Sequence, residues 1–158
     1  MLRLSNRGRY ALRAVFDLAL HTEAPVQARE VAARQHIPLR FLEQIFQLLK
    51  RSRLVESKRG PRGGFILARA PEDLKLGDVL RAVEGPVVLT GPPSARRGAR
   101  DAASVRVITD AVLTDLSRSV ERCFDGVTIQ DLCARSERVL VSARRARAGS
   151  DKASAYVI

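Results

Sequence analysis

The stretch that decides the fold is residues 31–65, VAARQHIPLRFLEQIFQLLKRSRLVESKRGPRGGF. Its first residues, 31–35, have helical composition and are followed by a break at His36-Ile37-Pro38, where proline interrupts the pattern. A second helix is predicted over residues 39–51, because apolar residues recur there every three or four positions. The segment therefore predicts two short helices joined by a tight turn.

A hairpin is predicted directly after the second helix. Residues 54–57 and 65–68 have strand composition and flank a glycine-rich turn. That turn, residues 58–64, is called the wing tip below and consists of Lys58, Arg59, Gly60, Pro61, Arg62, Gly63 and Gly64. Helix, turn, helix and hairpin in this order predict a winged helix-turn-helix, a fold that supports nucleic-acid binding.

The second helix has two distinct faces. One stripe is apolar and is expected to be buried: Leu42, Ile45, Phe46 and Leu49. The opposite side is polar: Arg40, Glu43, Gln44, Gln47 and Lys50. An α-helix fits the DNA major groove, where arginine and glutamine side chains can read base edges. On this helix alone, an ordinary core helix with a solvated polar face is the simpler interpretation.

The wing tip favours the functional interpretation. It places three cations, Lys58, Arg59 and Arg62, among glycines that allow the backbone to approach a partner closely. Such a loop can lie along phosphates or insert an arginine into a minor groove. A solvated basic turn is the alternative, but its position directly after a helix-turn-helix favours DNA contact.

Three segments resemble the Rrf2 family of bacterial transcriptional regulators: residues 5–11 (SNRGRYA), 38–46 (PLRFLEQIF) and 54–65 (LVESKRGPRGGF). The likeness is close over the first half of the chain and weaker to about Arg138. It implies a homodimer on a double-stranded DNA operator, with the second helix in the major groove and the wing in the minor groove. The implied contacts are Arg40, Phe41, Glu43, Gln44 and Arg59, with the backbone of Gly60 to Gly64 shaping the wing. Pro38 departs from the family, whose members often have a helix-capping serine there.

The expected cofactor content is none. In the iron-sulfur members of the family, three cysteines in the region of residues 90–100 bind a cluster. Here that region reads TGPPSARRGAR, and no cysteine or histidine occurs between Ile37 and Arg122. Because clusters are held by cysteine thiolates, with histidine an occasional substitute, this loop cannot supply the ligands. We therefore expect a family member that lacks a cluster and has no metal site.

The longest helix is predicted from Asp101 or Ala102 to about Phe124. It carries a sustained apolar stripe, formed by Val105, Ile108, Val112, Leu116 and Val120. The stripe is longer than a small domain needs, so a dimerisation helix is favoured over a helix that folds back on its own core. The family resemblance also implies dimerisation here.

The expected organisation is mainly α with a small β-hairpin. Residues 1–85 form the winged helix-turn-helix domain and residues 86–101 a loop. Residues 102–139 hold the dimerisation helix and a short helix opened by a capping box at Thr128. Residues 140–158 form a charged tail that is expected to be disordered.

The charge and cysteine content of the chain limit the class of protein that it can be. The net charge is +11, from 28 basic and 17 acidic residues. That excess suits an anionic polymer, although it also suits a membrane surface or an arginine-rich genome. No apolar run spans a bilayer and no secretory signal is visible, so we expect no membrane partner. Two cysteines, Cys123 and Cys133, indicate a cytoplasmic protein, not a disulfide scaffold.

No catalytic constellation is present in the sequence, so an enzyme is not expected. The prediction is a sequence-specific DNA-binding regulator, a homodimeric repressor that answers to a small-molecule or protein effector. Two alternatives remain: a redox-, metal- or cluster-responsive regulator that uses Cys123 and Cys133, and a winged helix that docks protein. Arg122 beside Cys123 can lower a thiol pKa, whereas a buried structural cysteine is the simpler interpretation.

Overall fold

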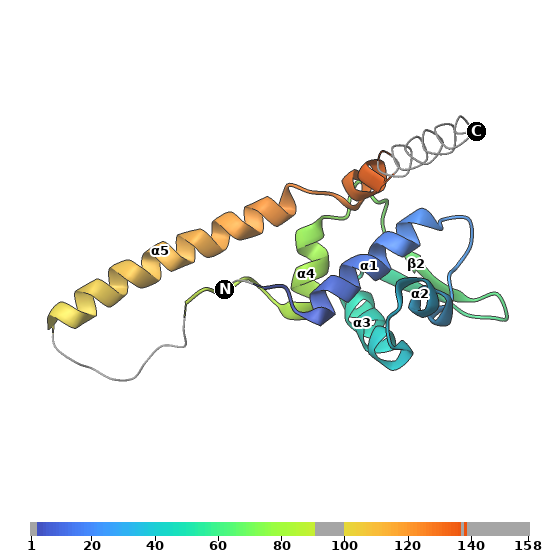
Figure 1. Ribbon diagram of the computed structural model, residues 1–158, viewed down its shortest axis with the longest axis horizontal. Coiled ribbons are helices and arrows are strands. Elements are labelled where there is room, and N and C mark those ends of the chain that lie inside the picture. Colours follow the sequence, from blue (N-terminus) through green and yellow to red (C-terminus); the bar gives the residue numbers. More distant parts are fainter. Residues whose placement is uncertain (1–2, 91–99, 137, 139–158) are drawn as a thin grey trace, which may run out of the picture.

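The computed structural model describes residues 3–90, 100–136 and 138, and the side chains of residues 100–104 are outside this description. Within the described residues, helices α1, α2 and α3 are followed by a two-stranded antiparallel sheet and then by helices α4 and α5 (Figure 1). A sixth helix covers residues 129–136. The mainly α fold with a small hairpin is confirmed, and no described helix is both long and apolar enough to cross a lipid bilayer.

Helix α1 (Asn6–Leu20) is capped by Ser5, whose side chain accepts a hydrogen bond from the Gly8 backbone at 3.2 Å. Its inner stripe is buried: Ala11, Ala14, Val15 and Leu18. Gly8 lies against Leu80 and Glu84 of α4 (Leu76–Glu84), where a methyl group would collide with the Glu84 carboxylate. The start of α1 is therefore held directly against α4.

Helices α2 (Ala28–Gln35) and α3 (Leu39–Arg51) form the helix-turn-helix. The break between them is sharp because His36 adopts the left-handed conformation, with φ of 51°. The predicted apolar stripe of α3 is confirmed as core: Leu42, Ile45, Phe46 and Leu49 are all fully buried. Burial of this stripe fixes which side of α3 faces outward.

Strands β1 (Val55–Lys58) and β2 (Gly64–Leu67) pair antiparallel, with Val55 opposite Leu67 and Lys58 opposite Gly64. Val26 adds an isolated bridge to Phe65 on the other edge of β2. Phe65 also stacks on Phe46 of α3, with ring centroids 4.2 Å apart. The hairpin is thus anchored to α3 and to the segment before α2.

Helix α4 (Leu76–Glu84) packs on α1, and α5 (Arg100–Asp125) leaves the body of the molecule as a single long rod (Figure 1). The C-terminal end of α5 is attached to the domain through an ion pair of 2.7 Å between Arg81 and Asp125. The predicted capping box is present, because Asp131 accepts from the Thr128 backbone at 2.9 Å. Residues 129–136 then bury Ile129 in the core.

Two predicted segments lie outside the described residues. They are most of the loop over 86–101, from residue 91 to residue 99, and the charged tail over 140–158. The described part of that loop, residues 86–90, runs along α5, where Glu121 and Ser117 accept backbone hydrogen bonds from Val87 and Leu89 at 3.1 Å each.

Candidate nucleic-acid interface

The outward side of α3 carries one polar stripe that no other part of the described chain covers. Its members recur at i, i+4, i+7 and i+11 and are all exposed; this set, called the outer stripe below, is Arg40, Gln44, Gln47 and Arg51. Within the described residues, the side chains of Arg40 and Arg51 have no hydrogen-bond or ion-pair partner. Sequence reasoning placed Arg40 and Gln44 at the site and left out Arg51, which extends the stripe by one turn.

The two flanks of α3 differ. Toward the hairpin, Lys50 donates a hydrogen bond of 2.7 Å to the Ser57 hydroxyl, and exposed Glu43 lies between this flank and the outer stripe. Toward α1, Phe41 is half-buried and meets Tyr10 edge-on, with ring centroids 5.9 Å apart. Phe41, expected to contact DNA, thus also packs against the core and leaves only part of its ring for a partner.

The wing tip projects from the body past α2 (Figure 1), and its residues 58–62 are exposed. A hydrogen bond of 2.9 Å from the Gly63 backbone to the Gly60 carbonyl closes the turn, and Gly60 has φ of 116°. A methyl group on Gly63 would collide with the Lys58 carbonyl, and one on Gly64 would collide with the Val26 carbonyl. Glycine is therefore required at 63 and 64 for the shape of the turn.

A buried ionic cluster holds α2 against α1. Asp17 of α1 is 2% exposed and accepts hydrogen bonds from Arg34 at 2.6 and 3.1 Å and from Gln35 at 2.8 Å. Burial raises the pKa of Asp17, but the hydrogen bonds and charge of Arg34 and the amide of Gln35 outweigh it, so the pKa lies below its ordinary value. Asp17 therefore stays ionised at neutral pH and fixes the helix pair that presents α3.

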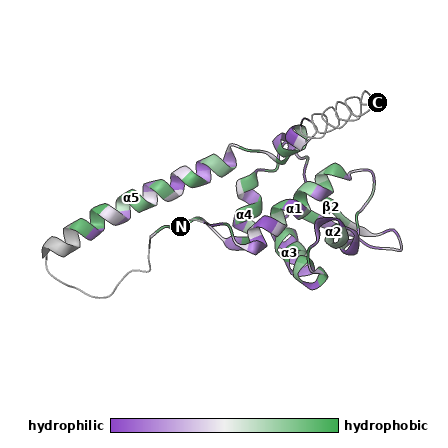
Figure 2. Cartoon of the chain, in the orientation of Figure 1, coloured by the Kyte–Doolittle hydropathy of each residue, from purple (hydrophilic) through white to green (hydrophobic). Residues whose placement is uncertain are grey.

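The residues predicted for dimerisation lie along one side of α5. Val105, Ile108, Val112 and Leu116 are 66, 65, 53 and 49% exposed, whereas Val120 is half-buried. Figure 2 shows hydrophobic residues along much of this helix, although its N-terminal part stands apart from the domain. The first four of these side chains are therefore left largely uncovered by the described part of the chain.

The two cysteines lie on successive helices and differ in exposure. Cys123 is exposed on α5 and Cys133 is buried in the following helix. Within residues 3–90 and 100–136, no three histidine, cysteine, aspartate or glutamate side chains are placed to hold a metal ion. The loop between α4 and α5 offers hydroxyl, guanidinium and backbone groups, which are not the thiolates that bind iron-sulfur clusters.

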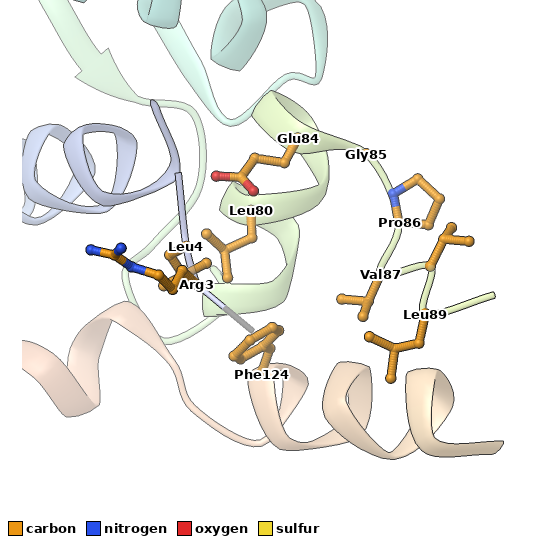
Figure 3. A pocket seen from close by; sticks show the side chains of 10 residues that line it. Arg3, Leu4, Leu80, Glu84, Gly85, Pro86, Val87, Leu89 and Phe124 are labelled. Carbon is orange, nitrogen blue, oxygen red and sulfur yellow. The ribbon is translucent and has the colours of Figure 1, made fainter. Parts of the chain in front are cut away.

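A cavity of about 270 Å³ lies where the domain meets α5. Figure 3 shows Leu4 and Leu80 on one side, Val87 and Leu89 on the other, and Phe124 of α5 below them. Its walls are mainly apolar, with two charged residues, Arg3 and Glu84, among them. The Glu84 carboxylate accepts a hydrogen bond of 2.6 Å from the Ser5 hydroxyl. The cavity touches both the segment that precedes α1 and the C-terminal end of α5.

A helix-turn-helix with an uncovered polar stripe, followed by a glycine-shaped basic hairpin, defines a winged helix-turn-helix of the DNA-binding class. Comparison with known proteins agrees. The model of the Rrf2 family, described as iron-dependent transcriptional regulators, matches residues 4–135. The HTH-type transcriptional regulator IscR of Erwinia tasmaniensis is 34% identical over 145 residues, which cover 91% of this chain and 86% of the relative.

Two solved structures extend the likeness to three dimensions. T. potens IscR superposes with a TM-score of 0.68 at 34% identity, covering 87% of this chain and 90% of that one. CymR, the global cysteine regulator of B. subtilis, gives 0.66 at 29% identity, covering 85% and 98%. The chain belongs to the Rrf2 family and is a DNA-binding transcriptional regulator.

Proposed function

We propose that this chain is a homodimeric, cytoplasmic repressor that recognises a two-fold symmetric operator without an iron-sulfur cluster. The observation that carries the proposal is that the outer stripe of α3 and the wing tip of the hairpin that follows it are both exposed and both carry cations. A protein of this charge gains affinity for DNA by releasing counterions from phosphates.

The two parts of the interface have different roles. Gln44 and Arg40 lie on the outer stripe, where bidentate hydrogen bonds to adenine and guanine edges are geometrically accessible to them. Glu43, beside them, is placed to accept from cytosine. Arg59 and Arg62 of the wing tip carry charge to phosphates or into the minor groove, while Gly60 to Gly64 let the backbone come close.

Dimerisation is proposed through the apolar stripe of α5. Five large aliphatic side chains along one rod, four of them about half or more exposed, are an unfavourable surface for a monomer. A second copy of the same stripe would bury them and would place two α3 helices for two half-sites. Sedimentation equilibrium tests this: a mass of one chain at micromolar concentration would contradict it.

The effector is proposed to be a small, mainly apolar molecule bound in the cavity between Leu4, Leu80 and Phe124. A ligand there would touch α4, the segment over 86–89 and α5 at once, so it could change how the rod is held relative to the DNA-binding domain. A cavity-filling variant, Leu80→Trp, should leave a promoter reporter fixed in one state as growth conditions change. A reporter that still responds normally would remove the cavity from the mechanism.

The redox alternative has one observation in its favour, the exposed thiol of Cys123. A Cys123→Ser variant that keeps wild-type regulation under oxidant would remove it. The other alternative, a winged helix that docks protein in place of DNA, is distinguished by the salt dependence of DNA binding.

The experiment that tests DNA binding is a salt titration with a duplex taken from the promoter of the regulator's own gene. Affinity should fall steeply between about 50 and 200 mM salt, by roughly 10³-fold or more if each dimer meets about six or more phosphates. Arg59→Ala should weaken binding, with Arg135→Ala, an exposed arginine on residues 129–136, as the matched control. Equal affinity at both salt concentrations would refute the proposal. A reporter with the same promoter then gives the sign of regulation.

A further inference from the structure

A shallow hollow joins the first turn of α1 to the outer stripe of α3. It is lined by Arg7 from α1 and by Gln44, Gln47, Leu48 and Arg51 from α3. Three of these residues belong to the outer stripe, and the two arginines come from different helices. The hollow is therefore continuous with the proposed DNA-reading surface, on the side of α3 away from the hairpin.

Four arginines of the same domain donate hydrogen bonds to other groups of the chain, whereas the two arginines of the hollow, like Arg40 of the outer stripe, do not. Arg9 donates to Asn6, Arg13 to Gln35, Arg34 to Asp17, and Arg81 to Asp78 and Asp125. Over the described residues, the side chains of Arg7 and Arg51 make no hydrogen bond or ion pair, and both are exposed. Two like charges brought to one hollow without an acidic partner repel each other, so their placement favours an external anion.

The position of the hollow identifies the anion. Lys50, tied to Ser57, puts a cation on the hairpin side of α3, whereas Arg7 and Arg51 put two on the side of α1. A helix in the major groove, about 12 Å wide, lies between two sugar-phosphate walls. Cations on one side of the helix alone would leave the second wall without a contact. The Gln44 and Gln47 amides between them suit bases at the floor of a groove, which a free inorganic anion does not offer.

We propose that Arg7 and Arg51 form a phosphate clamp on the wall of the major groove opposite the wing. The clamp holds phosphodiester oxygens of double-stranded DNA by charge and sets the depth of α3 without reading sequence. This inference rests on the proposed function, since it assigns a further contact to the same duplex. It also gives a role to Arg51, which the sequence pattern shows only as the last residue of the predicted helix.

The test compares salt slopes of full-length variants on one duplex. Arg7→Gln and Arg51→Gln should each lower the magnitude of the slope of log K against log salt, by about 0.9 for each phosphate that is no longer neutralised. Both copies in a dimer count, so the slope of the double variant should be smaller by about 3.6. The preference for operator over scrambled duplex should stay within about threefold of wild type, because phosphate contacts carry no sequence information. Arg7→Lys with Arg51→Lys keeps both charges and should restore most of the slope.

The matched control is Arg106→Gln on α5, which removes one exposed charge from the rod beyond the domain. If wild type shows a steep slope of log K against log salt and the double glutamine variant has the same slope as this control, the clamp is overturned and the proposed function is left intact. Wild type without salt-sensitive binding would overturn both. A slope reduction accompanied by loss of sequence preference would also overturn the clamp, because it would assign base reading to these arginines.

Discussion

Removal of the Asp17 carboxylate tests the cluster that holds α2 on α1. Asp17→Ala takes away the acceptor of three hydrogen bonds and leaves Arg34 and Gln35 without it. Breaking a buried ion pair by deleting one partner costs about 3–5 kcal/mol. The Arg34 side chain is 37% exposed, so its charge can return to water and the cost is lower, about 2 kcal/mol.

The assay is urea unfolding followed by circular dichroism at neutral pH. With a slope of about 2 kcal/mol per molar urea, the midpoint should fall by about 1 M without a change of slope. The control is Asp115→Ala, which removes an exposed pair with Arg118 on α5 and should cost less than about 0.5 kcal/mol. Equal midpoints for wild type and Asp17→Ala would refute the role of the cluster.

The difference in the free energy of unfolding between wild type and Asp17→Ala should depend on pH with a defined sign. The pKa of Asp17 is lower in the folded chain than the value of about 3.9 expected when unfolded. A depressed folded pKa contributes stability that is fully present above the unfolded pKa and lost as pH falls through the folded one. The difference in the free energy of unfolding between wild type and Asp17→Ala should therefore be constant above about pH 5 and become smaller below about pH 4. A gap that grows on acidification would contradict the assignment.

Three further predictions concern the interface and the dimer. Gln44→Ala should change which base is preferred in each half-site by about 1–3 kcal/mol, measured by competition among duplexes; an unchanged preference counts against base reading. Val112→Asp with Leu116→Asp should give a folded monomer by sedimentation, and a persisting dimer would move the interface elsewhere. Gly64→Ala should distort the wing and weaken DNA binding by about tenfold or more by anisotropy, whereas Gly126→Ala, with a Cβ no closer than 3.4 Å to its neighbours, should not.

The sequence predicted α3 well because its apolar period is strong. The predicted bounds, Leu39 to Arg51, are those observed, and all four core residues of the stripe are buried. Helix α2 starts earlier than predicted, at Ala28 and not Val31. Its first turn is stabilised by Glu30, which accepts from the Gln27 backbone at 3.1 Å, and a glutamine is not a residue that signals a helix start.

The site was only partly predictable. Polar residues of α3 and the wing tip are visible from period and composition, and they are indeed exposed along α3 and over residues 58–62. Contacts between distant residues are not visible in this way: Asp17 meets Arg34 across 17 positions, and Arg7 shares a hollow with Arg51. Phe41 was assigned to DNA by family likeness alone, and its contact with Tyr10 depends on how α1 packs on α3.

The most direct measurement of the central claim is selection of duplexes from a random library near physiological salt, with wild type and with Gln44→Ala combined with Arg59→Ala. Wild type should enrich a two-fold symmetric sequence with half-sites about one or two helical turns apart, and the double variant should lose that enrichment. Enrichment of the same sequence by both proteins, or of none by wild type, would contradict the claim that α3 and the wing grip DNA together.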